Sequence, residues 1–264
     1  MIIYKTADEI AVMRKSNQIV ARVLTELKAL VRPGVRTREL DAYAEARARE
    51  LGAVPAFKGY RGYPASLCTS VNEEIIHGIP SERPLKEGDI IGLDFGVLFE
   101  GFYGDAAVTI PVGSVGPTAQ RLIDVAEAAF YKGIEQMKKG NRISDISHAV
   151  QEYVEGAGFS VIRSFVGHGI GHSPHEEPQV PNFGPPGRGP KIKEGLTLAI
   201  EPMIAAGDWQ EEILDDGWTA VTRDRSLSAH YEHTVALTRR GVEILSLGEP
   251  GKPSLISPEE KPYA

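Results

Sequence analysis

An internal repeat is the sequence feature that most constrains how this 264-residue chain can fold. The stretch GVRTREL at 34–40 resembles GNRISDI at 140–146, which lies 106 residues further on. The tripeptide KEG at 86–88 recurs at 193–195, at an offset of 107 residues. Two matches at nearly one offset favour two related halves. A long-period array is excluded because it needs at least three units.

The predicted elements follow the same order in both halves. A capping-box pattern at Thr6 and apolar residues at helical spacing predict a first helix that ends near Pro33-Gly34. Further helices are predicted over Thr37–Leu51, Pro117–Lys139 and Ser144–Glu155, with strands up to about Val112 and then up to about Leu245. We therefore predict an α+β fold in one domain, 1–264, with halves at roughly 1–113 and 114–246 and a loosely held tail at 247–264.

Composition excludes several classes of protein. The net charge of −7 gives no support for specific nucleic-acid binding, and no run of about 18 apolar residues suggests a membrane span. The first residues lack the apolar core and cleavage site of a signal peptide. A single cysteine, Cys68, excludes an internal disulfide and suits a reducing compartment. We expect a cytoplasmic protein.

Acidic residues stand at matching places in the repeat. Asp94 lies eight residues after Lys86, and Glu201 lies eight residues after Lys193. Each acid ends an apolar run typical of a buried strand, where a carboxylate is unfavourable unless it is paired or binds a cation.

Asp94 and Asp105 are predicted to belong to one hairpin. A hairpin centred between Phe99 and Glu100 would place the two acids opposite each other, whereas a turn at Glu100-Gly101 would make them diagonal neighbours. Either arrangement puts two carboxylates on one face, where they persist if one of them is protonated or if a cation lies between them. The alternative is a pair of solvated acids that flank a hairpin. Glu232 lies within a strand-like stretch at 228–237, and we expect Asp105 to be its equivalent in the first half.

The stretch VGHGIGHSPHEEPQV at 166–180 contains His168, His172 and His175. The glycines between the histidines oppose a helix, so a loop or strand end is predicted. Spacing alone does not tell which histidine binds a metal, and a plain surface loop is an alternative. One histidine beside four carboxylates would favour Mn²⁺, Fe²⁺ or Co²⁺, with Zn²⁺ allowed. Such a set can hold two ions and hydrolyse an acyl or phosphoryl group.

Together these motifs resemble the type I methionine aminopeptidases in their short bacterial form. The resemblance is carried by Asp94 and Asp105, by the GHGIG and HEEP motifs around His168 and His175, by IEPM around Glu201 and by YEHT around Glu232. It extends from the first helix to about residue 245. It implies the pita-bread fold, in which two pseudo-symmetric halves surround a curved antiparallel sheet, and a single catalytic domain.

The resemblance also implies roles for individual residues. It implies two divalent ions per chain, drawn from Co, Mn, Fe(II) or Zn, and Glu201 as the proton acceptor. His175 would stabilise the oxyanion at the scissile amide, His77 would face the leaving group, and His172 matches no functional position. The implied metal ligands are Asp94, Asp105, His168, Glu201 and Glu232.

The implied activity is removal of the initiator methionine from nascent proteins whose second residue is small. The implied methionine pocket is walled by Tyr60, Tyr63, Cys68 and Trp218. Three residues depart from relatives: Pro174 replaces an aromatic residue, Phe57 replaces a common Cys, and His230 replaces a frequent Gln. We expect Phe57 and Pro174 to have exchanged roles in filling the pocket.

Three rival functions share part of this pattern. A proline-specific aminopeptidase has the same fold but a longer chain, and an inactive pita-bread binding protein would have lost ligands. Phosphoester hydrolysis needs cationic phosphate holders, and no Arg or Lys lies beside the acids in the motifs. The expected partners are nascent chains beginning with Met and, transiently, the ribosome; the expected state is a monomer with no membrane or specific nucleic-acid partner.

Overall fold

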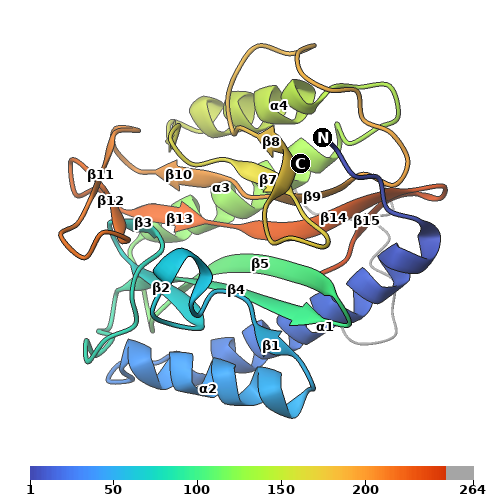
Figure 1. Ribbon diagram of the computed structural model, residues 1–264. Helices are drawn as coiled ribbons and strands as arrows, with labels where there is room; N and C mark the ends of the chain where they lie inside the picture. Colours follow the sequence, from blue (N-terminus) through green and yellow to red (C-terminus); the bar gives the residue numbers. More distant parts are fainter. Residues whose placement is uncertain (248–264) are drawn as a thin grey trace.

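A computed structural model of the chain describes residues 1–247. The predicted tail therefore lies outside the described residues, apart from Leu247. Mixed helices and strands alternate along the chain (Figure 1). They are α1 (Ala7–Leu30), α2 (Thr37–Glu50), β1 (Val54–Pro55), the 3₁₀ turn η1 (Tyr60–Gly62), β2 (Leu67–Val71), β3 (Glu74–Ile76), β4 (Ile90–Phe99), β5 (Phe102–Pro111), α3 (Pro117–Ile134), α4 (Ile143–Gly156), β6 (Ser160–Val161), β7 (Gly167–Gly169), β8 (Glu176–Val180), β9 (Thr197–Ile200), β10 (Met203–Ala205), β11 (Glu211–Ile213), β12 (Ala220–Thr222), β13 (Ser228–His230), β14 (Glu232–Thr238) and β15 (Gly241–Ile244).

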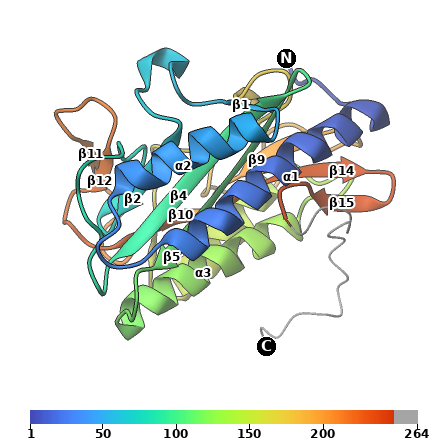
Figure 2. The same ribbon diagram turned by 90° about the horizontal axis from the view of Figure 1, so that it is seen from below.

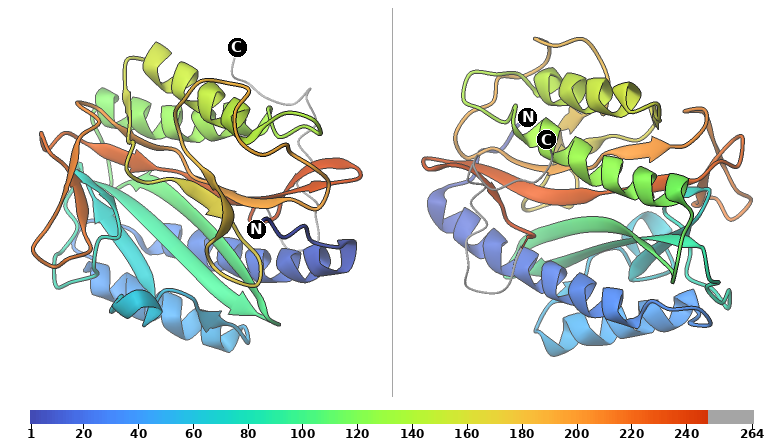
Figure 3. Two further views of the ribbon diagram at one scale, coloured as in Figure 1. Left: turned by 45° about the horizontal axis from the view of Figure 1, so that its top comes forward. Right: turned by 180° about the vertical axis from the view of Figure 1, so that it is seen from behind.

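A curved nine-stranded sheet forms the centre of the molecule. Its strands run in the order β1-β4-β5-β14-β9-β7-β8, with β2 also paired to β4 and β15 to β14. Seen from below and from behind, α1 and α3 lie across the back of this sheet (Figures 2 and 3). The main apolar core lies between these helices and the sheet. The opposite, concave face is left for a site.

The predicted duplication has a geometric counterpart in the structure. Helices α2 and α4 both contain 14 residues and begin 106 residues apart. Just before each helix a single β-bridge forms, Arg36 to Pro84 and Arg142 to Lys191. In each helix an acid at the third position accepts the N–H of the residue before the helix, Glu39 from Arg36 and Asp145 from Arg142. The similarity at 34–40 and 140–146 thus encodes one repeated helix start.

The predicted helix over Pro117–Lys139 was wrong at its end, because α3 stops at Ile134. Beyond it the chain tightens into turns in which each N–H reaches back only three residues, from Gln136 to Gly133 and from Met137 to Ile134. These turns bury Met137 and lead to Gly140, which has a left-handed φ of 100°. Burial of one apolar residue overrides the local helix propensity that the sequence suggested.

Helix α1 approaches the sheet closely at one point. A Cβ on Gly104 of β5 would lie 2.9 Å from the backbone of Ser16 and Asn17, so only glycine allows this approach. The side chain of Asn17 accepts the N–H of the next residue, Asp105, at 3.3 Å. Among residues 1–247, no helix has the length and apolar character needed to cross a bilayer.

We predict that Gly104→Ala lowers the free energy of unfolding by about 1–3 kcal/mol, because its methyl group must displace α1. Gly156→Ala is the control, since a Cβ there meets nothing within 4 Å and alanine favours the helix by up to about 1 kcal/mol. Urea denaturation of both variants measures the difference. Equal stability of the two variants would contradict the close packing at Gly104.

Candidate metal centre and its cavity

The pleat of the sheet places five predicted ligands on its concave face. Asp94 of β4 and Glu232 of β14 both pair with Ala107 of β5, so their side chains share one face. Asp105 lies two residues before Ala107 and therefore points the same way. Three carboxylates from three neighbouring strands thus converge.

The second half completes the set through β9 and β7. Thr234, two residues after Glu232, pairs with Ala199, which also pairs with His168 of β7. Glu201 lies two residues beyond Ala199, just after β9 ends, and continues the same face. His168 Nε2 lies 3.4 Å from Glu201 Oε1. Donor atoms of Asp105, His168 and Glu232 all lie within 4.8 Å of one another.

The structure decides between the two hairpin arrangements. Phe99 pairs with Phe102, so the turn is Glu100-Gly101, and Asp105 faces Gly96 rather than Asp94. The two acids are therefore diagonal neighbours on one face. They are not solvated flanking residues, because Asp105 is buried and Asp94 is partly buried.

The carboxylates are held in an electrostatically unfavourable state. Burial raises the pKa of Asp94 to about 7 and raises those of Asp105, Glu201 and Glu232 well above their ordinary values. The neighbouring carboxylates add to the rise in the pKa of the last three groups. Among residues 1–247, Asp94 Oδ1 and Asp105 Oδ1 are closed off from solvent without a hydrogen-bond partner. The neighbouring like charges and the carboxylate oxygens without a hydrogen-bond partner are both consistent with a cation bound between them.

His168 is prepared as a neutral ligand. Burial lowers its pKa to about 3, so the ring carries no charge at neutral pH. Its Nδ1 lies 3.0 Å from the Gly169 carbonyl and serves as the donor, which leaves the lone pair on Nε2 directed at the acids. The donor set of four carboxylates and one imidazole suits a divalent metal ion.

His230 adds a polar group that sequence analysis treated only as a departure from relatives. Its Nε2 is buried without a hydrogen-bond partner among the described residues. This nitrogen lies 3.7 Å from Glu201 Oε2 and 3.8 Å from Glu232 Oε2. His230 is therefore a further nitrogen beside the same carboxylates, and its place two residues before Glu232 in a strand-like stretch was the available signal.

The five ligands line a cavity of about 340 Å³ together with the predicted substrate-side residues. Tyr63 packs edge-on against Trp218 at 5.2 Å, and with Cys68 it belongs to a small apolar cluster. Phe57 also lines the cavity, whereas Pro174 does not. The predicted residues on the lining are Tyr60, Tyr63, Cys68, His77, His175 and Trp218.

The two remaining histidines of interest, His175 and His77, both line this cavity. His175 packs edge-on against the His168 ring at 4.3 Å, and its Nδ1 lies 2.9 Å from the Tyr60 hydroxyl. His77 follows β3 with a left-handed φ of 59°, and burial lowers its pKa to about 4. His172 lies outside the lining, as the resemblance implied.

Sequence analysis missed five lining residues, of which Ile76 ends β3 directly before His77. Ser164, Phe165 and Val166 lead directly into the ligand strand β7, and that adjacency was the available signal. Arg61 lies at the exposed rim, where its guanidinium stacks over the Tyr60 ring. The expectation that no Arg or Lys lies beside the acids concerned the motifs. Arg61 is a cationic residue of the cavity lining outside these motifs.

Comparison with known proteins gives a family match over most of the chain. The model of metallopeptidase family M24 matches residues 11–239. A methionine aminopeptidase of Clostridium perfringens is 54% identical over 247 residues, which cover 94% of this chain and 99% of that protein. Methionine aminopeptidase 1 of Bacillus subtilis is 50% identical over 93% of this chain and 99% of its own length.

Solved structures give the same result for the fold. A crystal structure of methionine aminopeptidase from Thermotoga maritima superposes with a TM-score of 0.92 at 45% identity, covering 94% of this chain and all of that one. The prolidase of Pyrococcus furiosus has a TM-score of 0.75 at 23% identity and covers 94% of this chain but 66% of its own. That second likeness concerns the fold alone, and the predicted pita-bread α+β class is confirmed.

We predict that a divalent metal stabilises the protein through the acidic cluster. A concentration of 100 times the dissociation constant should add about 2.7 kcal/mol to the free energy of unfolding. In metal-free protein, Glu232→Gln should add about 0.5–2 kcal/mol by removing one repelling charge, and it should abolish most of the metal effect. Thermal unfolding with and without Mn²⁺ tests both, with exposed Glu194→Gln as control. A metal-free Glu232→Gln protein less stable than wild type would contradict the repulsion.

Proposed function

This chain is a member of metallopeptidase family M24, and we propose that it is a methionine aminopeptidase that uses divalent metal to hydrolyse the bond after an N-terminal methionine. One observation carries the proposal: a single cavity joins the five-residue donor set to an apolar aromatic wall. The donor set suits metal-assisted hydrolysis, and the wall suits an unbranched apolar side chain.

The residues that would hold the metal are Asp94, Asp105, His168, Glu201 and Glu232. A divalent cation in this place supplies Lewis acidity, which polarises a carbonyl group and makes water nucleophilic at neutral pH. The Glu201 carboxylate accepts the proton of the attacking water at Oε2 or Oε1 and returns it to the leaving amine. His175, at the rim beside Tyr60, donates to the oxygen that becomes negative.

The wall selects the N-terminal residue to be removed through the fit of its side chain. Phe57, Tyr63, Cys68 and Trp218 form or adjoin one apolar cluster at the metal centre, which matches the polarizable thioether of methionine. His77, between the rings of Phe165 and Trp218, faces the leaving-group side. A small second residue is the expected preference.

Finer features belong to the same proposal. Four carboxylates support two ions, with Co, Mn, Fe(II) or Zn as candidates. The single Cys68 supports a cytoplasmic location. We infer a monomer that acts on nascent chains beginning with Met and that contacts the ribosome transiently.

We predict that metal-stripped protein supplied with one metal at a time releases methionine from a Met-Ala peptide but not from a Met-Lys peptide. Glu201→Gln should lower kcat by about 10²–10⁴-fold, because it removes the proton acceptor. Glu194→Gln is the matched control, since that carboxylate is exposed and pairs with Arg239. Release of alanine from an Ala-Pro peptide would instead assign the protein to the proline-specific relatives.

A second prediction concerns the pocket. Phe57 packs against Gly96 of β4, two residues from Asp94, so its ring can take the place that Pro174 leaves unfilled. Phe57→Ala should lower kcat/KM for Met-Ala by about 10–200-fold while the metal affinity stays the same. Steady-state kinetics and calorimetry measure the two quantities. Unchanged kcat/KM would refute the exchange of roles between Phe57 and Pro174.

A further inference from the structure

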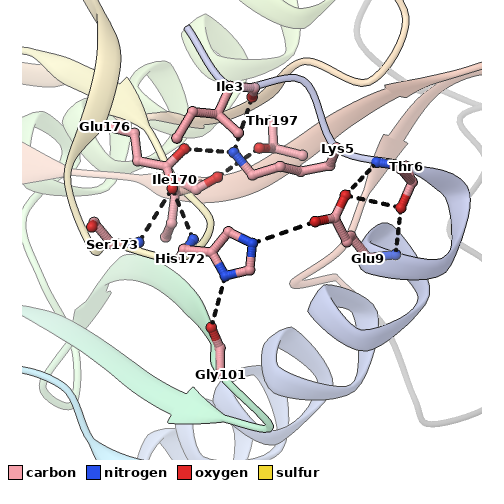
Figure 4. Close-up of polar contacts among 10 residues, drawn as sticks. All are labelled: Ile3, Lys5, Thr6, Glu9, Gly101, Ile170, His172, Ser173, Glu176 and Thr197. Atoms are coloured by element: carbon pink, nitrogen blue, oxygen red, sulfur yellow. Dashed lines mark hydrogen bonds and ion pairs between the residues drawn. The ribbon is translucent and has the colours of Figure 1, made fainter. Parts of the chain in front are cut away.

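A buried ion pair joins the N-terminal segment to the turn beside the active site (Figure 4). Lys5 Nζ donates to Glu176 Oε2, and the two side chains are only 1% and 6% exposed. Lys5 lies two residues before α1, whereas Glu176 begins β8. Buried ion pairs contribute little net stability compared with apolar packing, so stability alone gives no reason for this pair.

Glu176 also closes the turn that carries His175. Its Oε1 accepts the backbone N–H of His172 at 2.8 Å and that of Ser173 at 3.2 Å. These donors begin the turn and Glu176 ends it, so one carboxylate joins both ends (Figure 4). Pro174 and His175 lie between these fixed points.

Lys5 is itself held in place by the second half of the chain. Its backbone N–H donates to the Gly195 carbonyl at 2.7 Å, and Nζ donates to the Ile3 carbonyl at 3.0 Å. A Cβ on Gly171 would overlap the Lys5 side chain, so the glycine leaves room for the ammonium group. The positive charge is therefore fixed relative to the strand that leads to Glu201.

A second contact, at His172, is weaker. Its Nε2 lies 3.3 Å from Glu9 Oε1, and its Nδ1 lies 3.3 Å from the Gly101 carbonyl. The His172 side chain is 51% exposed, so solvent screens this contact. The buried pair is the contact that can hold the turn.

We propose that Lys5 and Glu176 are positioning residues that fix the His175 ring against His168 and Tyr60. The inference rests on the proposed function, because it concerns the placing of the residue that donates to the reacting oxygen. A displacement of about 1 Å at such a residue can lower a rate by about 10²-fold. The N-terminal segment thereby becomes part of the catalytic framework.

The test compares Glu176→Gln, Lys5→Met and the double variant with wild type on a Met-Ala peptide. The single variants should lower kcat by about 10–100-fold, with KM and the calorimetric Kd for Mn²⁺ within twofold. The double variant leaves no unpaired buried charge, so it should regain the unfolding temperature while kcat stays low. This variant keeps the inference testable if a single variant fails to fold.

A second comparison asks whether Glu176 acts through His175. If it does, Glu176→Gln should change kcat less than twofold in a His175→Ala background. The matched control is the double variant Lys15→Met, Glu100→Gln. It removes an exposed ion pair between α1 and the turn that joins β4 to β5, and it should leave kcat unchanged.

Three outcomes would overturn the inference. They are an unchanged kcat in folded Glu176→Gln, an equal loss in the His175→Ala background, or a parallel loss of Mn²⁺ affinity. Wild type that releases no methionine with any metal would overturn the proposed function and this inference with it. Active wild type beside unaffected variants would overturn only the inference.

Discussion

Repulsion among four buried or partly buried carboxylates is the constraint on which the rest of the structure depends. Asp94, Asp105, Glu201 and Glu232 share one face, and burial, joined at three of them by neighbouring carboxylates, raises their pKa values and opposes their ionisation. A divalent cation relieves this repulsion at once. The extensive core behind the sheet must offset the strain whenever the cation is absent, which is a common relation between function and stability.

The duplicated architecture explains how the acids come to meet. The β5–β14 pairing joins the two halves, and it brings Asp105 and Glu232 together across the seam. Asp94 and Glu201 stand at equivalent places beyond this seam, eight residues after a repeated Lys. The halves share the repeated starts of α2 and α4 but differ in chemistry, since the proposed imidazole ligand His168 comes only from the second half. The first half therefore offers only carboxylate donors, whereas the second half offers carboxylates and one imidazole.

Periodicity and capping patterns predicted the helices well, because those signals are local. The β4–β5 hairpin was predicted, but the sequence could not decide between two positions for its turn. Strand order was beyond local reasoning, because nothing in the local sequence tells that β14 pairs with both β5 and β9. The same limit applies to Lys5, whose partner Glu176 is 171 residues away. Family resemblance supplied His77, because a left-handed turn residue has no catalytic pattern of its own.

The proposed pocket wall and the proposed metal centre are built on the same pair of neighbouring strands, β2 and β4. Cys68 of β2 pairs in register with Asp94 of β4, so a wall residue of the pocket and a metal ligand lie on adjacent strands. The apolar cluster lines the same cavity as the acids, and a lower local dielectric beside apolar groups strengthens charge interactions. The proposed exchange of roles would keep this wall closed, because the Phe57 ring packs against Gly96 of β4 while Pro174 lies outside the lining.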